Sequence, residues 1–202
     1  MAIKSLQHSS LEDNIFYRSM LAGNDAYFPE FESDDFLEEV VLTSSASSVT
    51  FSGLDAYSDY KHLQIRWVGR GDAAVTYSNA AMRVNGDAGS NYAKHDLRGD
   101  GSSVSSNAAA GASSFYIGNV PFGSSTANAF GAAVIDVLDF ASTNKNTTFR
   151  VLSGDTIAPQ VTLSSGLYVS TSAVTSVTMF ASFTAGRNWD TNSRFSLYGS
   201  KG

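Results

Sequence analysis

Apolar and polar residues alternate from Lys61 to Arg70, and this alternation constrains the fold more than any other feature of the sequence. One set of positions is apolar and comprises Leu63, Ile65 and Trp67. The other set is polar and comprises His62, Gln64, Arg66 and Arg70. A period of two residues is typical of a strand with one buried face and one solvated face. The segment therefore predicts an antiparallel strand whose apolar side lies in a core.

Short runs rich in β-branched and aromatic residues recur along the chain, separated by turn signals such as Asn85-Gly86-Asp87 and Ser153-Gly154-Asp155. These runs cover 48–51, 80–85, 114–120, 132–140, 147–152, 160–169, 174–183 and 194–198. No helical pattern alternates with them, which disfavours a parallel α/β sheet. The sequence therefore predicts an all-β protein, an antiparallel β-sandwich of the jelly-roll type.

The expected core of this sandwich contains the inward positions of the strongest runs: Leu63, Ile65, Trp67, Val84, Ile117, Val134, Val137 and Phe195. The stretch from Gly101 to Ser114 is almost entirely Ser, Ala and Gly, and we interpret it as a long flexible loop.

Charge divides the chain near Leu42. Residues 1–42 carry nine acidic groups against Lys4 and Arg18, a net charge of −7, whereas residues 43–202 contain no glutamate and have a net charge of +1. We interpret 1–42 as an acidic, extended N-terminal arm with a short helix between Ser9 and Ala22, and 43–202 as the β-sandwich domain. A solvated acidic edge of the domain is the alternative interpretation.

Composition excludes several classes of function. The formal net charge of −6 disfavours nucleic-acid binding, which needs clustered Lys and Arg. The longest strongly apolar run, 130–138, is far shorter than the roughly 20 residues of a membrane-spanning helix. The absence of cysteine excludes disulfides and thiolate zinc sites, and the N-terminal residues show no secretory signal. We therefore expect synthesis in a cytoplasm.

The densest group of potentially reactive residues is His95-Asp96 with Asp87 and Asp100. Adjacent strand residues point to opposite faces, so His95 and Asp96 are not expected to act as a base and its orienting acid. The spacing of the three aspartates does not match a calcium loop, and Asp136 and Asp139 are too poorly aligned for a glycosidase pair. We predict no catalytic residue, no cofactor and no metal site.

The segment Arg187, Asn188, Trp189 and Asp190 is the best candidate for surface contact. Trp189 offers an aromatic face and its neighbours offer hydrogen-bonding groups, which suit either a glycan or a neighbouring subunit. A third interpretation makes Trp189 a core residue beneath a loop.

Several blocks of sequence, in the same order, resemble a family of small virion structural proteins of tailed bacteriophages. The blocks are Tyr60 to Arg66, Met82 to Tyr92, Phe130 to Phe140, Ser172 to Thr178 and Phe195 to Gly202. The stretch from Tyr17 to Asn24 is similar to arms that precede such domains. The acidic run from Phe31 to Glu39 departs from the plainer linkers of the family.

This resemblance implies a non-enzymatic, homo-oligomeric surface component of the virion, either a fiber protein or a capsid-decorating protein, with a trimer expected by analogy. The arm would dock onto a capsid, tail or fiber partner through its apolar residues, which include Leu11, Ile15, Phe16, Tyr17, Met20 and Leu21. The alternative function is a carbohydrate-binding receptor-recognition module of a phage tail that binds a host-surface glycan.

Overall fold

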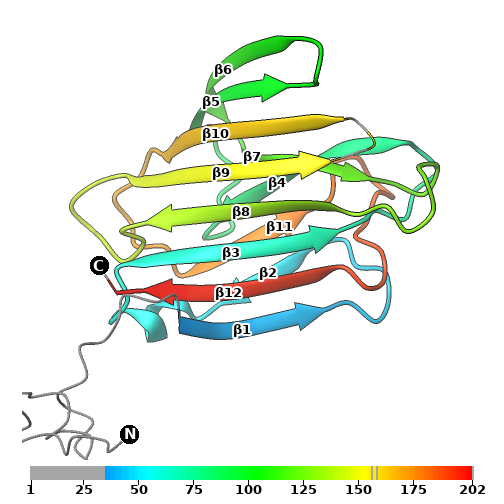
Figure 1. Cartoon of the computed structure of the whole chain (residues 1–202). Helices are drawn as coiled ribbons and strands as arrows, with labels where there is room; N and C mark the ends of the chain where they lie inside the picture. The colour runs from blue at the N-terminus through cyan, green and yellow to red at the C-terminus, as the bar shows by residue number, and fades with distance from the viewer. Residues whose placement is uncertain (1–34, 156, 158, 202) are drawn as a thin grey trace, which may run out of the picture. The chain divides into compact units, whose positions relative to one another are not determined.

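The computed structural model describes residues 35–155, 157 and 159–201, which form two packed antiparallel sheets (Figure 1). The large sheet has the order β1 (Asp35–Val41), β12 (Arg194–Ser200), β3 (His62–Gly69), β8 (Gly131–Leu138), β9 (Thr147–Asp155), β10 (Gln160–Tyr168), β5 (Tyr92–Gly99) and β6 (Val104–Ala112). The small sheet has the order β2 (Val49–Ser52), β11 (Ser176–Phe180), β4 (Tyr77–Val84) and β7 (Phe115–Pro121). A short 3-10 helix, Leu54–Tyr57, follows β2.

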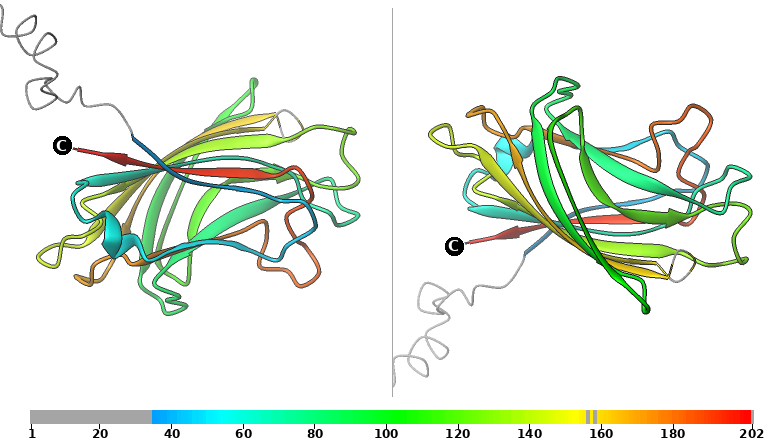
Figure 2. Two further views of the ribbon diagram at one scale, coloured as in Figure 1. Left: turned by 90° about the horizontal axis from the view of Figure 1, so that it is seen from below. Right: turned by 90° about the horizontal axis from the view of Figure 1, so that it is seen from above.

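The connectivity is that of a jelly roll with two added hairpins. If β5–β6 and β9–β10 are set aside, the remaining eight strands divide equally between the sheets, with the spatial orders β1-β12-β3-β8 and β2-β11-β4-β7. This is two Greek keys wrapped into a sandwich. The added hairpins extend only the large sheet, so it reaches beyond the small one at the β6 end (Figures 1 and 2).

The core lies between the sheets and confirms most of the expected list. Seven of the predicted residues are buried: Leu63, Ile65, Trp67, Val84, Ile117, Val137 and Phe195. Val134 was expected in the core, and this is wrong, because the inward positions of β8 are Gly131, Ala133, Ile135 and Val137. Val134 alternates with them and points outward, with 36% of its surface exposed.

One close contact sets the distance between the sheets near β10. A Cβ atom on Gly166 would lie 1.8 Å from Cε2 of Phe115 on β7, so glycine is required where the aromatic ring meets the strand. Phe115 in turn packs against Phe149 of β9, with ring centroids 5.2 Å apart. The added hairpin β9–β10 is thereby joined to the core.

The domain boundary at residue 42 is wrong, since the sheet begins at Asp35. Strand β1 pairs with β12 from Asp35↔Gly199 to Val41↔Arg194. Its apolar residues Leu37 and Val40 pack on the core while its acidic residues remain on the sheet edge. The solvated acidic edge is thus the better interpretation of this part of the acidic segment. The predicted arm helix lies outside the described residues.

The predicted loop from Gly101 to Ser114 is also wrong, because most of it forms β6. This strand pairs with β5 from Gly99↔Val104 to Tyr92↔Ala112. Its sequence shows no alternation because, apart from Ala112 at its end, neither face of the strand meets the core, and seven of its nine residues are exposed. Pairing with β5 alone defines it as a strand.

Arg70 was predicted on the solvated face, and it is instead buried just beyond the end of β3. Its Nη1 donates hydrogen bonds of 2.9 Å to the carbonyl oxygens of Thr126 and Ala129 and to Ser125 Oγ. The guanidinium group therefore organises the loop between β7 and β8. Among the described residues, no helix is long and apolar enough to cross a bilayer.

The neighbours Val134 and Ile135 test the assignment of inward and outward positions on β8. Replacing the buried Ile135 with Thr is expected to lower the free energy of unfolding by about 2–3 kcal/mol, since it removes apolar contacts and buries a hydroxyl. The matched change Val134→Thr is expected to stay within about 0.5 kcal/mol. Denaturant unfolding of the two variants measures both. Equal losses would contradict the assigned register.

Candidate functional site

The outer face of the large sheet carries an exposed apolar row across four adjacent strands. We define the outer apolar row as Val134 (β8), Leu152 (β9), Leu163 (β10) and Leu97 (β5), which are cross-strand neighbours in that order. Their exposed fractions are 36%, 54%, 55% and 53%. Val68, Val161 and Val104 are exposed on the same sheet. The row therefore places four large apolar side chains next to one another on the exposed face of the sheet.

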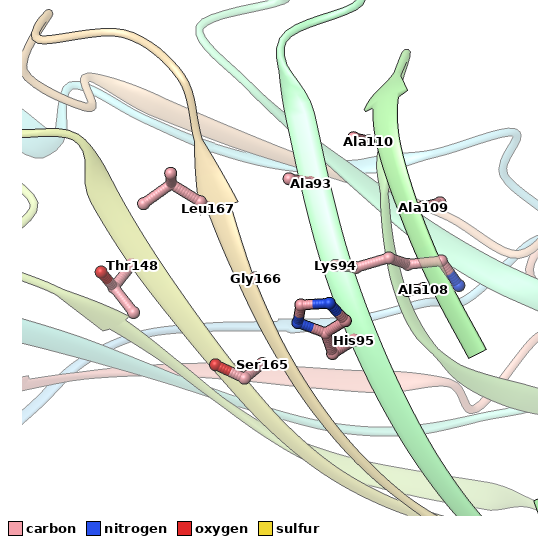
Figure 3. Close-up of a pocket in the computed structure, with 10 residues that line it drawn as sticks. All are labelled: Ala93, Lys94, His95, Ala108, Ala109, Ala110, Thr148, Ser165, Gly166 and Leu167. Carbon is pink, nitrogen blue, oxygen red and sulfur yellow. The ribbon is translucent and has the colours of Figure 1, made fainter. Parts of the chain in front are cut away.

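Beside this row the outer face is hollowed where β5, β6, β9 and β10 meet (Figure 3). The hollow has a volume of about 490 Å³ and is lined mainly by small or neutral side chains. Its ionisable lining residues are His95 and Lys94, and the ammonium group of Lys94 turns to the inner face, where it pairs with Asp96. His95 lies opposite Ser165 on β10 and Ala108 on β6. These neighbours provide no carboxylate to orient the imidazole, so the hollow does not contain a Ser-His-acid arrangement.

Asp96 points away from His95, into the space beneath the overhanging end of the large sheet. Its Oδ2 lies 2.6 Å from Lys94 Nζ and 3.0 Å from Arg98 Nη2, and its Oδ1 accepts a 2.8 Å hydrogen bond from Ser164. Both cations also lie over the ring of Tyr116 on β7, at 4.8 and 4.9 Å from its centroid. Burial opposes ionisation of Asp96, but the hydrogen bonds from Lys94 and Ser164 outweigh it and lower its pKa. We interpret the network as structural because Lys94, Arg98 and Ser164 all bind Asp96, although the buried Nε of Arg98 has no hydrogen-bond partner among the described residues.

The other aspartates of the predicted constellation lie in separate turns. Asp87 accepts hydrogen bonds from Asn91, from the Gly89 amide and from Tyr168, which together hold its pKa below the usual value. Asp100 accepts hydrogen bonds from the backbone and hydroxyl groups of Ser102 and Ser103, which lower its pKa strongly. Although Asp87, Asp96 and Asp100 are close in the sequence, their carboxylates bind different partners in the fold.

The remaining acidic candidates also have structural partners. Asp136 accepts a 2.9 Å hydrogen bond from Gln64, and Asp139 pairs with Lys145 in the turn after β8. Across the described residues, no three His, Asp or Glu side chains gather in a way that could hold a metal ion.

Trp189 is fully buried, which corrects its proposed contact with a glycan or a subunit. Its ring packs on Trp67 and Phe195, with centroids 5.5 and 4.9 Å away, and its Nε1 donates to the Met179 carbonyl at 3.1 Å. Of the predicted alternatives, the core residue beneath a loop describes it correctly. The residues next to Trp189 in the sequence are polar, which is typical of an exposed segment, although the ring itself is buried.

The polar neighbours of Trp189 hold the loop in place. Asn188 donates from its backbone and from its side chain to Asp72, each at 3.0 Å. Arg187 donates to Ser78 at 3.3 Å, and the carboxylate of Asp190 accepts from the Thr191 amide. The segment therefore closes one end of the sandwich.

A polar cleft of about 680 Å³ lies at the overhanging end of the sandwich, on the inner side of the large sheet. We define the polar end cleft by Tyr77, Asn79, Arg98, Asn119 and Gln160, which line it from β4, β5, β7 and β10. Asn119 accepts a hydrogen bond from Tyr116 and donates one to Gln160. Tyr77 is 50% exposed. No alternating pattern or motif marked these residues, because four different strands bring them together.

The predicted docking residues Leu11, Ile15, Phe16, Tyr17, Met20 and Leu21 lie outside the described residues. A scan against protein-family models and a search of curated proteins both find no match to this chain.

Removing the charge of Asp96 tests its structural role. The variant Asp96→Asn leaves Lys94 and Arg98 without their buried counter-ion, so we expect about 3 kcal/mol of destabilisation at pH 7. The control Asp59→Asn changes an exposed carboxylate and is expected to stay within about 0.5 kcal/mol.

The pH dependence follows from the lowered pKa of Asp96. A depressed carboxyl pKa stabilises the fold above the unfolded-state value of about 3.9, and this contribution is lost as the pH falls through the folded-state pKa. Wild-type stability should therefore decline below about pH 4, and the decline should be shallower in Asp96→Asn. Identical acid slopes in thermal unfolding would refute the assignment.

Proposed function

We propose that this protein is a non-enzymatic structural component of a tailed-phage virion, a homo-oligomeric surface protein of the fiber or capsid-decorating kind. The observation that carries the proposal is the outer apolar row, which runs across four strands with about half of each leucine exposed. A contiguous row of exposed apolar side chains suits protein–protein contact.

The chemistry of the polar groups supports an assembly role over catalysis. His95 and Asp96 face opposite sides of the large sheet, and Asp87, Asp96 and Asp100 are each held in structural hydrogen bonds. A general base or nucleophile needs a free group aligned with a partner. The resemblance of five sequence blocks to tailed-phage virion proteins supports the same role, and the acidic arm supplies a second surface for attachment.

Particle incorporation tests the role of the arm in the full-length chain. We expect the triple variant Leu11→Ser, Phe16→Ser, Leu21→Ser to be lost from purified phage particles, because it removes the apolar side chains proposed to dock. The matched control changes three polar arm residues, Gln7→Ser, His8→Ser and Asn14→Ser, and should be incorporated normally. Quantitative mass spectrometry of particles measures both. Equal incorporation would overturn the anchoring role, and absence of the wild-type protein from particles would overturn the virion role.

The polar end cleft favours one second candidate function, recognition of a carbohydrate on a host surface. Its Tyr77 presents an aromatic face that could stack on a sugar ring, beside the amide and guanidinium groups of Asn79, Gln160 and Arg98. These groups match the hydrogen-bonding needs of sugar hydroxyls. The cleft replaces the Trp189 segment as the candidate glycan site.

The variant Tyr77→Ala tests this second candidate. If the cleft binds host polysaccharide, Tyr77→Ala should weaken binding at least tenfold in calorimetry, since it removes the stacking face. The control Phe183→Ala removes a similarly exposed aromatic ring on the loop after β11 and should bind as wild type. Unchanged binding by Tyr77→Ala, or no binding by wild type, would eliminate the cleft as a glycan site.

A further inference from the structure

Strand β6 is a free sheet edge that the rest of the described chain does not cover. It bonds to β5 on one side and forms the end of the eight-stranded sheet (Figure 1). Its nine residues, Val104–Ala112, contain no charge and no proline, and seven of them are exposed. Val104 at its start is 75% exposed. A long, uncharged free edge offers its unpaired backbone groups to another strand.

The other sheet edges carry the protection that β6 lacks. Strand β1, at the opposite end of the same sheet, is acidic at Asp35, Glu38 and Glu39, and a bulge lies between Phe36 and Glu38. In the small sheet, β2 has only four residues and all seven residues of β7 are buried. Charge, bulges, short length and burial are the usual means of blocking edge pairing. Strand β6 has a bulge of its own near Gly111, but its stretch from Val104 to Ala109 is regular, uncharged and largely exposed, which leaves it as the open edge among the described strands.

The β5–β6 hairpin is held in a defined shape although β6 contacts little. Asp100 fastens its turn by accepting hydrogen bonds from the amides of Ser102 and Ser103 at 2.9 and 2.7 Å. At its base, Ala112 packs against the core and pairs with Tyr92. Fixing an edge strand before association lowers the entropy lost on pairing. Strand β6 pairs with β5 alone among the described strands, so a partner strand would supply its second set of backbone hydrogen bonds.

We propose that β6 pairs antiparallel with β6 of a second copy of this chain, about a two-fold axis at Ala108. In this register Ala108 lies opposite Ala108 of the second copy, and Asn107 lies opposite Ala109. The pairing joins the two large sheets edge to edge through main-chain hydrogen bonds.

The edge itself selects a second copy as the occupant. Two identical uncharged strands match in length, and their Ser, Asn and Ala side chains bring no like charges together. The β1 edge of another molecule would instead present three carboxylates and a bulge.

This inference rests on the proposed assembly role and identifies a second copy of the chain as the partner of β6. A two-fold contact predicts an even number of copies, in contrast to the trimer expected from analogy. The two proposals fail separately, because purified protein tests the β6 contact and particle incorporation tests the virion role.

Cross-linking at Ala108 tests the register directly, since the chain contains no cysteine. In Ala108→Cys the two introduced thiols face each other across the axis, within the Cα separation that a disulfide needs. We expect most of the purified full-length protein to form a disulfide-linked dimer under mild oxidation. The control Ser172→Cys, in an exposed loop, should cross-link at least tenfold less. Equal cross-linking of the two variants would overturn the proposal.

A charge placed on the edge tests the same contact through the mass of the particle in solution. The double variant Ser106→Lys, Ala108→Lys brings like charges across the axis, and it is expected to reduce the oligomer to half its mass, 21.4 kDa in the case of a dimer. The control Thr171→Lys, Ser172→Lys adds the same charge in a loop and should keep the wild-type mass. A wild-type monomer, a wild-type trimer or an undiminished mass of the edge variant would each overturn the proposal, and circular dichroism verifies that both variants remain folded.

Discussion

The packing of Trp189 against Trp67 joins the two sheets, and the rest of the sandwich is arranged around this contact. Trp67 lies on β3 of the large sheet, whereas Trp189 donates its indole N–H to Met179 on β11 of the small sheet. The backbone of Trp189 also pairs with Ala46 and Gly71, so one residue ties three loop segments to the core. Strand β3 has a glycine where it approaches the ring, because a Cβ atom on Gly69 would lie 2.6 Å from the Trp189 ring.

The unequal width of the sheets explains why charged residues lie in the interior. Eight strands face four, so β10, β5 and β6 extend past the apolar layer that the small sheet provides. At this end the inner face of β5 changes from apolar residues to Lys94, Asp96 and Arg98, which close over Tyr116 instead of an aliphatic core. The overhang thus has a polar lining on its inner side and the outer apolar row on its other side, with different surfaces available for different partners.

The sequence predicts those strands whose two faces differ in environment. Leu63, Ile65 and Trp67 alternate with polar residues because β3 has the core on one side and solvent on the other. Strand β6 has solvent on both sides, so its composition carries no period, and the outward Val134 is as apolar as its inward neighbours. Trp189 sits in a polar segment whose hydrogen bonds serve the loop while its ring enters the core. The polar end cleft depends on register between distant strands, which local patterns do not encode.

The pairing of β1 with β12 places the first and last strands of the sandwich side by side. The large sheet therefore lacks one of its inner strands until β12 has been synthesised, because β12 separates β1 from β3. Pairing between strands so far apart in sequence slows folding, and strand edges stay unpaired until that pairing forms. A chain that ends before Arg194 therefore has no β12 with which β1 can pair.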